Sequence, residues 1–197
     1  EWMEVYERVS TETATKFCNY MGIPVPVAIR SIAPTGSIGL LAGTTTGIEP
    51  IYATAYKRRF LSGGSTWNYQ YCLDATAKCI VDSGVDPTSI ETASQLALEP
   101  RRRIEFQANM QDYVDMAISS TLNLPAWGTE GNNESTVQEL ADILSEFAPR
   151  LRGITFYPDG SRGGQPITEI PWGEAKWLEG ETYIEGNDPC NGGSCGS

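Results

Sequence analysis

Hydrophobic residues recur at helical spacing from the start of the chain. Between residues 2 and 21 the apolar positions keep intervals of three and four, and this period predicts an amphipathic helix. Gly22 and Pro24 follow directly and are typical of the end of a helix. The predicted apolar face consists of Trp2, Val5, Tyr6, Val9, Phe17, Tyr20 and Met21.

Three later stretches also have helical spacing. Residues 67–83 form one of them, and Pro100 stands at the first position of a longer helix. Ser135 and Gln138 have the spacing of a capping box for a helix that continues through Phe147. The apolar face after Pro100 consists of Ile104, Met110, Val114, Ala117 and Ile118.

Short runs rich in β-branched and aromatic residues separate these helices. They predict strands over residues 27–32, 52–61, 119–124 and 153–157. Alternation of strands with helices is typical of βαβ units. We therefore expect an α/β fold with a parallel sheet or barrel segment and helices packed outside it.

The pattern changes after residue 168. Residues 169–197 contain six acidic residues and one lysine, have little periodicity and end in a glycine-rich stretch. Such a composition favours a mobile tail over a packed element. We therefore expect a packed domain over residues 1–168 and a mobile acidic tail over residues 169–197.

The composition is that of one folded domain with an acidic surface. Of the 197 residues, 40% are hydrophobic and 10% aromatic, which is too apolar for a disordered chain. No run approaches the roughly 20 apolar residues that a membrane-spanning helix needs. We therefore expect no membrane as a partner. The net charge of −11 repels the phosphate backbone of nucleic acids, so we expect no polynucleotide partner either.

The chain contains no histidine, which removes several kinds of chemistry at once. It excludes the Ser-His-Asp arrangement, histidine general bases and histidine-ligated zinc. The five cysteines are an odd number, and three lie in apolar segments, which favours a reducing compartment over a secreted disulfide framework. Since no signal peptide opens the sequence, we expect a cytoplasmic protein.

One loop, between a predicted strand and a helix start, has the character of an anion site. Backbone N–H groups at a helix start, with two hydroxyl donors beside them, form a geometry that binds phosphate. A turn of Pro, Gly and Ser is also common for steric reasons alone, and both interpretations hold for residues 43–47 as well. The residues of the first loop are Ala33, Pro34, Thr35, Gly36, Ser37 and Ile38.

Two cysteines near the end of the chain are a more specific signal. Cys190 and Cys195 are separated by a glycine-rich stretch, so their thiols can reach each other. A disulfide across so small a loop stabilises almost nothing, and reversible dithiol exchange is the better interpretation. The alternatives are an unused surface pair and half of a metal site shared with another chain. Cys18, Cys72 and Cys79 are interpreted as small buried apolar residues on helical faces.

Basic and polar clusters leave two interpretations open. The basic runs at residues 57–59 and 101–103 are either contacts for phosphate or an acidic partner, or solvated surface. Residues 159–162 follow a predicted strand, where ligand-binding groups collect in parallel sheets, but as a bare tetrapeptide they form only a turn.

Three ordered blocks of the sequence resemble the C-terminal part of the catalytic chain of ribonucleotide reductases. They are residues 33–50, the pair Met110 and Gln111 with residues 117–125, and residues 153–162. The resemblance covers nearly all of residues 1–165. The adenosylcobalamin-dependent class II is the closer variety, because class I large subunits carry a neighbouring tyrosine pair where Tyr157 is followed here by proline.

The resemblance implies a fold and a set of roles. The fold is the C-terminal part of the ten-stranded α/β barrel of these reductases, with a flexible C-terminal tail. In this family a thiyl radical abstracts the ribose 3′ hydrogen, the 2′ hydroxyl leaves as water, and a cysteine pair supplies the electrons. A second, C-terminal pair re-reduces the first, and Cys190 and Cys195 fit that role. The residues assigned by the resemblance to the substrate's phosphates are Pro34, Thr35, Gly36, Ser37 and Ile38.

The departures from the family pattern imply a partner. No Asn-x-Cys-x-Glu segment occurs in the chain, so the radical-bearing cysteine is absent from it. The resemblance therefore implies a C-terminal subunit or fragment of a split or processed reductase, active only with an N-terminal chain that carries that cysteine. Adenosylcobalamin is expected to be bound mainly with the partner, thioredoxin or a glutaredoxin-like protein is the expected reductant, and no metal is implied. Pro158 stands where family members usually have arginine, which weakens any role carried over to that position.

Two other interpretations remain at this stage. One is a fragment of a class I large subunit, which would need a metal-bearing radical partner instead of cobalamin. The other is a non-catalytic binding module that associates with a reductase. If the chain is instead part of a class II reductase, as the resemblance favours, it serves the synthesis of deoxyribonucleotides for DNA replication.

Overall fold

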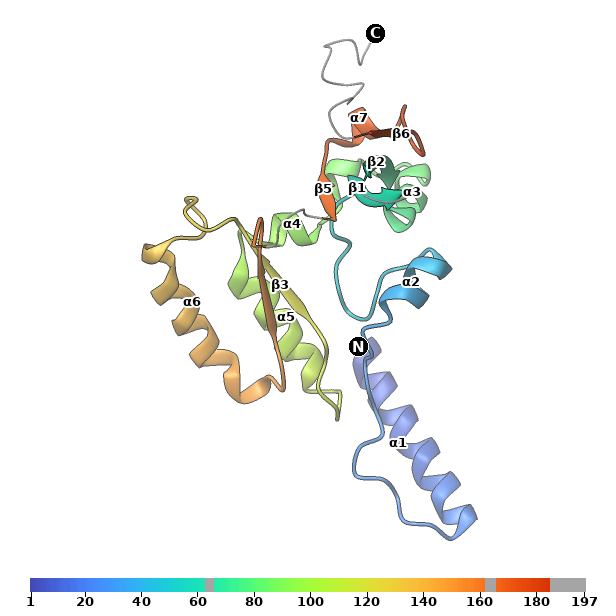
Figure 1. The fold of residues 1–197 in the computed structure, drawn as a ribbon. Coiled ribbons are helices and arrows are strands. Elements are labelled where there is room, and N and C mark those ends of the chain that lie inside the picture. Colours follow the sequence, from blue (N-terminus) through green and yellow to red (C-terminus); the bar gives the residue numbers. More distant parts are fainter. Residues whose placement is uncertain (63–65, 162–165, 185–197) are drawn as a thin grey trace.

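The computed structural model describes residues 1–62, 66–161 and 166–184, and Figure 1 shows their arrangement. In the first half of the described chain helices and strands come in runs of one type, in the second half they largely alternate, and short 3-10 helices (η1 and η2) lie between them. In chain order the elements are α1 (Trp2–Met21), α2 (Gly36–Ala42), β1 (Ala55–Ser62), β2 (Thr66–Leu73), α3 (Ala75–Asp82), η1 (Pro87–Ser89), α4 (Ala93–Leu96), α5 (Pro100–Gln111), β3 (Thr121–Leu124), α6 (Glu134–Phe147), η2 (Ala148–Arg150), β4 (Thr155–Pro158), β5 (Ile167–Glu169), α7 (Trp172–Ala175) and β6 (Thr182–Ile184).

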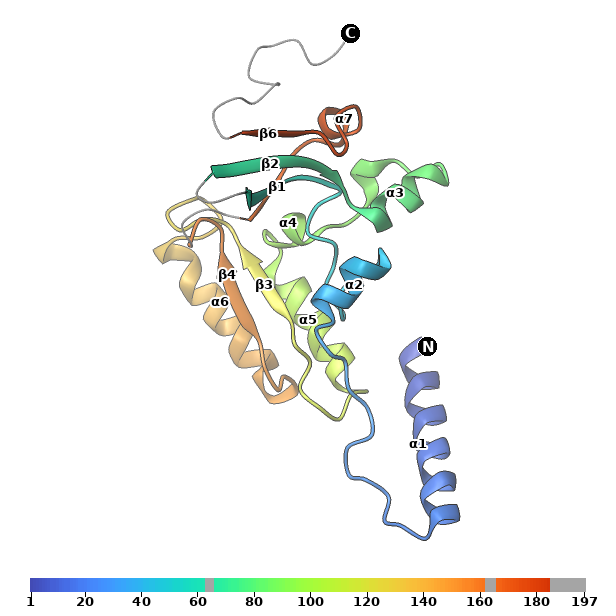
Figure 2. The same ribbon diagram turned by 45° about the vertical axis from the view of Figure 1, so that its right-hand side comes forward.

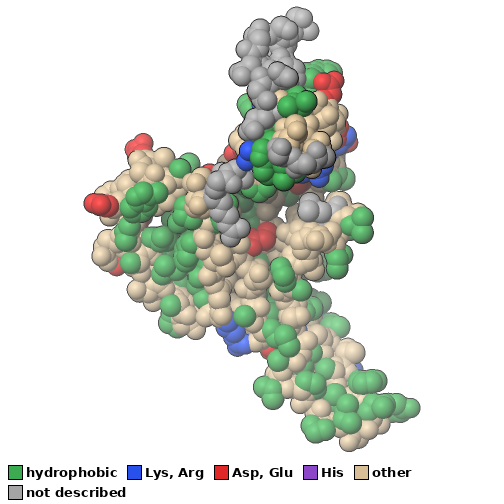
Figure 3. Space-filling model, viewed as in Figure 1, with side chains coloured by type: hydrophobic (Ala, Val, Ile, Leu, Met, Phe, Trp, Pro, Cys, Tyr) green, Lys and Arg blue, Asp and Glu red, His purple; other side chains and the backbone are tan. Residues whose placement is uncertain are grey.

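The first predicted helix is confirmed as α1, which ends where Gly22 adopts a left-handed conformation with φ 67°. Its apolar face is largely exposed: Trp2 is 87% and Tyr20 86% accessible. In both ribbon views α1 stands apart from the other elements, and hydrophobic side chains gather over this end of the molecule (Figures 1, 2 and 3).

The buried Arg30 links α1 to the segment around Asp115. Arg30 is 8% exposed, and its Nη2 donates to Asp115 Oδ1 at 2.9 Å. Its Nη1 donates to the Thr11 hydroxyl on α1 at 2.6 Å. The other carboxylate oxygen of Asp115 accepts the backbone N–H groups of Ile29 and Arg30 at 2.8 and 2.9 Å. These N–H groups, together with the Arg30 charge, hold the pKa of Asp115 below its usual range.

The hydrophobic core lies where α5 and α6 pack against two parallel strands. β3 and β4 pair in register from Thr121 with Thr155 to Leu124 with Pro158. Figure 2 shows α5 and α6 running alongside this pair. The buried members of the core are Ile104, Ala108, Leu122, Leu124, Ile143 and Phe147.

The helix predicted to run through Phe147 is present as α6, but its cap differs from the prediction. Asn133 accepts the Ser135 N–H with its side chain, and the Thr136 hydroxyl accepts the Asn133 N–H at 3.0 Å. The capping box therefore uses Asn133 and Thr136 and not Ser135 and Gln138. Asparagine is as good an N-cap as serine, and the N-cap of the helix lies two residues before the predicted Ser135.

The second sheet has four antiparallel strands in the order β5-β1-β2-β6. The helix predicted over residues 67–83 is wrong for its first half, because β2 pairs with β1 along their whole length, from Ala55 opposite Leu73 to Ser62 opposite Thr66. Aromatic residues alternate along β2, which suits a pleated strand. Only Ala75–Asp82 is helical, capped by the Asp74 carboxylate, which accepts the Ala77 N–H at 2.9 Å.

The sequence predicts a mobile tail from residue 169, but the residues up to Ile184 form ordered elements. β5 pairs with β1 and β6 pairs with β2, so residues 167–184 complete both edges of the antiparallel sheet. Backbone pairing and the stacking of Tyr183 on Tyr69, with ring centroids 5.3 Å apart, order a segment that has little periodicity of its own. The remainder of the tail, including Cys190 and Cys195, lies outside the described residues.

The α/β class is confirmed, with two corrections. Residues 27–32 form no strand but an irregular segment held by Asp115. In the described ranges, parallel pairing is restricted to β3 and β4, and the two sheets do not close into a barrel. No helix in the same ranges is both long and apolar enough to cross a bilayer.

Candidate functional site

Two glycine-containing loops pack against each other at the start of α2. Thr35, at φ 42°, accepts the Gly47 N–H with its hydroxyl at 2.9 Å and the Gly39 N–H with its carbonyl at 2.7 Å. A Cβ at Gly39 would lie 2.9 Å from the Thr46 methyl carbon, and one at Gly47 2.9 Å from the Ala33 carbonyl oxygen. Glycine at both positions therefore permits the close approach of residues 33–39 to residues 44–47.

The first of these loops presents donors that the protein does not use. No described group accepts the backbone N–H of Gly36, Ser37 or Ile38, and the side chains of Ser37 and Ile38 are exposed. The loop is thus free to offer N–H and hydroxyl groups to an anion. The assignment of Pro34, Thr35, Gly36, Ser37 and Ile38 to substrate phosphates stays a prediction.

A cavity of about 440 Å³ opens beside the two loops. The alternation of β3 divides its residues between the core and this cavity: Leu122 and Leu124 are buried in the core, and Thr121 and Asn123 line the cavity. The other lining residues come from the two loops, from β1 and β5, and from the starts of α3 and α4; they include Gly36, Thr44, Thr45, Thr46, Glu49, Tyr56, Arg58, Asp74 and Ile167.

Sequence reasoning missed part of the cavity walls. Tyr56 and Asp74 lie outside the loops and blocks that the sequence indicates as functional, because their neighbours in space are far away in the sequence. Arg58 stood out only as a member of a basic run. The signal that could have found it is its alternation with Lys57 and Arg59 in a strand, which places it on the opposite face of the sheet from both.

The ionisable groups on this side of the sheet are largely neutralised. Burial raises the pKa of the Tyr56 phenol, and the nearby Cys72 and Asp74 raise it further, so Tyr56 is uncharged at neutral pH. Burial also raises the pKa of the Cys72 thiol. Asp74 is occupied as the cap of α3.

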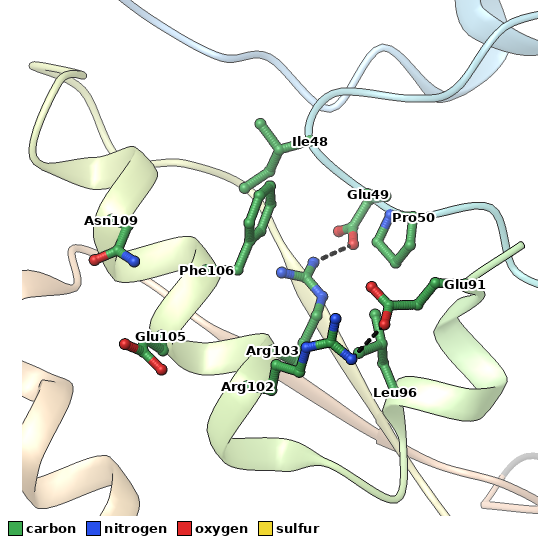
Figure 4. A pocket seen from close by; sticks show the side chains of 10 residues that line it. All are labelled: Ile48, Glu49, Pro50, Glu91, Leu96, Arg102, Arg103, Glu105, Phe106 and Asn109. Carbon is green, nitrogen blue, oxygen red and sulfur yellow. Dashed lines mark hydrogen bonds and ion pairs between the residues drawn. The ribbon is translucent and has the colours of Figure 1, made fainter. Parts of the chain in front are cut away.

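Glu49 forms a rigid link between the second loop and the core (Figure 4). One carboxylate oxygen accepts from Arg103 Nη2 at 2.7 Å and the other from the Thr121 N–H at 2.7 Å. Arg103 is 4% exposed and also donates to the Ser120 hydroxyl. Arginine and carboxylate thus fix the loop after Gly47 to both α5 and β3.

A second cavity, of about 360 Å³, lies on the other side of Glu49, between Ile48, Leu96 and Phe106 (Figure 4). Its rim holds an ion pair between Arg102 and Glu91 at 2.5 Å. Arg101 pairs with Glu146 at 2.8 Å. The whole basic run at 101–103 therefore has carboxylate partners within the chain.

The cysteines of the described residues are dispersed. Cys18 is buried, as predicted, whereas Cys72 is half-buried on a strand and Cys79 is exposed. The prediction of buried helical positions is thus wrong for the last two. Within the described ranges, no cluster of three or more His, Cys, Asp or Glu side chains could hold a metal ion.

The corner after β4 lies at the carboxyl end of both parallel strands. The Asp159 N–H donates to the Leu124 carbonyl at 3.0 Å, so the ends of β3 and β4 stay together there. Arg162 lies outside the described residues, and the ligand-facing role of residues 159–162 stays a prediction.

Comparison with known proteins identifies the family of the chain. Residues 27–148, which include both glycine loops, β1, β3 and α5, match the family model described as the barrel domain of ribonucleotide reductase. The chain belongs to the ribonucleotide reductase family. It is 32% identical over 187 residues to a vitamin B12-dependent ribonucleoside-diphosphate reductase of Mycobacterium tuberculosis. The aligned region covers 85% of the chain and 25% of that relative.

Two further similarities agree with this membership. A vitamin B12-dependent ribonucleotide reductase of Streptantibioticus cattleyicolor is 26% identical over 175 residues, covering 74% of the chain and 28% of that relative. The crystal structure of a B12-dependent (class II) ribonucleotide reductase superposes with a TM-score of 0.66 at 13% identity, over 91% of this chain and 27% of that one. This last similarity shows a shared fold. The chain spans only about a quarter of the length of these reductases.

Proposed function

We propose that the chain is the C-terminal piece of an adenosylcobalamin-dependent reductase that converts ribonucleotides to deoxyribonucleotides by radical chemistry. It contributes the substrate-phosphate loop and the reducing cysteine pair, and a companion contributes the cysteine that carries the radical. The B12-dependent names of its relatives favour this class over a class I fragment.

The observation that carries the proposal is the cavity beside the two glycine loops. Gly36, Thr44 and Asn123 come from two of the sequence blocks that resemble the reductases, and they line one cavity of about 440 Å³. A cavity of this size with convergent polar groups and open N–H donors suits a phosphorylated small molecule. In this proposal the parallel strands β3 and β4, with α5 and α6 packed on one face, are two strands of the ten-stranded barrel.

The two cavities beside Glu49 in the described part of the chain do not form a complete site for the cofactor. They measure about 440 and 360 Å³, and a corrinoid with its adenosyl group is far larger than the drug-sized ligands that such cavities enclose. The chain also has no histidine that could help to hold the cofactor. We therefore assign adenosylcobalamin, which supplies the radical, mainly to the companion.

The cysteine pair Cys190 and Cys195 serves as the electron carrier. In each cycle its two thiols become a disulfide while a disulfide in the active site becomes two thiols, so two electrons and two protons move inward. Thioredoxin or a glutaredoxin-like protein then reduces Cys190 and Cys195 again by the same exchange.

The exposed face of α1 and the free edges of the β3-β4 pair suit a companion chain. Trp2 and Phe17 are 87% and 58% exposed, although they belong to one apolar stripe. In the described part of the chain each of β3 and β4 pairs on one side only. Apolar stripes and unpaired edges of this kind are covered in stable proteins, and here the rest of the catalytic body would cover them.

The test is reconstitution of the assembled reductase with adenosylcobalamin, a ribonucleotide and one of two reductants. With thioredoxin alone, Cys190→Ser is expected to abolish multiple turnover, whereas a small dithiol that reaches the active site restores it. Cys79→Ser, at an exposed thiol on α3, is the matched control and should keep full activity with both reductants. Full thioredoxin-driven turnover by Cys190→Ser would remove the tail from the proposal, and activity without cobalamin would favour the class I alternative.

A further inference from the structure

We propose that Arg58 is a specificity-determining residue of the substrate site, and that its guanidinium binds the outermost phosphate of a ribonucleoside di- or triphosphate. The inference rests on the proposed function, because it takes the 33–38 loop as the place of the inner phosphate.

The strand register places Arg58 on the face of the sheet that lines the cavity. In β1 it lies opposite Gln70 of β2 and Ile167 of β5, and it shares its face with Tyr56 two residues earlier. Arg58, Tyr56 and Ile167 all line the cavity that contains Gly36.

The guanidinium carbon of Arg58 is 5.7 Å from the centre of the Phe60 ring, two residues along the same face. The neighbours of Arg58 in the basic run lie on the opposite face of the sheet, against other aromatic rings. The Lys57 ammonium is 5.1 Å from the centre of the Tyr71 ring, and the Arg59 guanidinium carbon is 3.9 Å from the centre of the Trp67 ring. The strand thus turns one of three adjacent cations toward the cavity and two away from it.

Arg58 differs from most basic residues of the chain in having no carboxylate partner. Its one hydrogen bond to a described residue runs from Nη2 to the Gln70 side-chain oxygen at 2.7 Å, and no described carboxylate lies within ion-pair distance of it. The chain carries a net charge of −11, so acidic partners are plentiful. The basic residues that do pair with a carboxylate are Arg8, Lys16, Arg30, Lys57, Lys78, Arg101, Arg102, Arg103 and Arg150.

Both carboxylates that line the cavity have partners elsewhere. Glu49 pairs with Arg103 at 2.7 Å, and Asp74 accepts the Ala77 N–H at the N-terminus of α3. Tyr56 is uncharged. Among the described lining residues Arg58 is the one cation, and it has no carboxylate partner there, which favours an anion as its ligand.

The 33–38 loop and Arg58 lie at different parts of the cavity wall, so we expect them to bind different phosphates of one nucleotide. Gly36, which begins the N-terminal turn of α2 together with Ser37 and Ile38, lines one part of the cavity, and Arg58 of β1 lines another. If the loop holds the inner phosphate, we expect a monophosphate to leave Arg58 unoccupied and a chain of two or three phosphates to reach the guanidinium. The planar fork of arginine suits two oxygens of a terminal phosphate, which carries the most charge.

The experiment measures the dissociation constants of cytidine mono-, di- and triphosphate with the assembled reductase, by equilibrium titration. In Arg58→Gln the constants for the di- and triphosphate are expected to rise by about tenfold or more, because a charge-assisted hydrogen bond is lost, while that for the monophosphate stays nearly unchanged. Arg58→Lys keeps the charge but not the fork and should give an intermediate rise. Arg59→Gln removes the same charge from the opposite face and is the matched control, with no change for any of the three nucleotides.

The outcomes separate this inference from the proposed function. If Arg58→Gln changes no constant, or weakens all three nucleotides equally, the inference is overturned. A loss for all three nucleotides in Ser37→Ala would then still support the phosphate loop. If Ser37→Ala also leaves every constant unchanged, or if the wild-type assembly binds none of the nucleotides, the proposed function fails as well. A circular dichroism spectrum identical to that of the wild type confirms that each variant is folded.

Discussion

The parallel layer of β3 and β4 and the antiparallel sheet around β1 and β2 use their side chains in opposite ways. In the first, Leu122 and Leu124 are 2% and 9% exposed and pack under α5 and α6. In the second, Tyr71 is fully buried, but most of the other side chains are half-buried or exposed and carry rings and charges. One region supplies a closed core, and the other supplies chemical groups to the cavity.

This difference separates stability from binding. Substitutions in the core of the parallel layer should unfold the protein without a particular effect on nucleotides. Substitutions at the cavity should change binding and leave the unfolding transition in place. The following predictions test this separation, beginning with the largest expected effect.

Leu122→Ala should be the most destabilising change. It removes a side chain that is 2% exposed from a packed core and should lower the free energy of unfolding by about 2–5 kcal/mol. Leu61→Ala, at a position that is 51% exposed on β1, is the matched control and should cost much less. Urea denaturation measures both, and equal losses would contradict the contrast between the two regions.

Asp115→Asn should lower the free energy of unfolding by about 2–3 kcal/mol, because the buried Arg30 then lacks its charged acceptor. This position lies between α5 and β3 in the chain and holds the segment that leads into the phosphate loop. Denaturation of the variant and the wild type in the same buffer measures the difference. A loss below about 0.5 kcal/mol would show that Glu7, with an oxygen 3.7 Å from Arg30, compensates the charge alone.

The same pair of proteins should show a pH dependence. Because the folded-state pKa of Asp115 is depressed, its stabilising effect is complete above the ordinary carboxyl pKa of about 4. The effect is lost as the pH falls below that value and through the folded-state pKa. The difference between wild type and Asp115→Asn should therefore shrink in acid, and a difference that grows there would contradict the assigned shift.

Ser37→Ala should weaken nucleotide binding by about 1–3 kcal/mol, and Thr35→Val should act in the same direction. Ser37 is exposed and contributes no hydrogen bond to a described residue, so its removal should leave the unfolding transition unchanged. Titration of the assembled reductase with a ribonucleotide measures the change. Thr35→Val also removes the acceptor of the Gly47 N–H and should lower stability slightly.

The smallest effect is expected at the cap of α6. Asn133→Ala should cost about 1 kcal/mol of unfolding free energy, since it removes the side chain that accepts the Ser135 N–H. Ser135→Ala leaves that bond in place and should cost less. Thermal melting of both variants decides between this cap and the one that the sequence predicts, and a larger loss in Ser135→Ala would favour the latter.

The sequence predicts the parallel layer better than the antiparallel sheet, and the reason is physical. The helix after Pro100 and the helix through Phe147 each bury an apolar face in one core, so their period is visible in the sequence. Strand β2 carries Trp67, Tyr69 and Tyr71, whose large rings suit both a helix face and a strand face. Its pairing with β1 decides the matter, and a pattern within one segment does not contain that information.

The candidate site was predictable in part. The loop at Pro34–Ile38 was found from its residue types, because glycine and hydroxyl residues before a helix start suggest an anion site. Glu49 and Arg103 lie 54 positions apart, and their link depends on how α5 packs against β3. The edge strand β6 and the last residue of β5 were assigned to a tail, because the order of these strands comes from their partners and not from their own composition.

The most direct test of the account is a reconstitution in which the remainder of the reductase, carrying the radical cysteine, is assayed for deoxyribonucleotide formation with and without this chain. Adenosylcobalamin, a ribonucleotide and a dithiol are present throughout. The account predicts product only when both polypeptide parts are present, and a loss of product when Ser37→Ala is combined with Arg58→Gln. Equal product formation without this chain would show that it is a non-catalytic associate of the reductase.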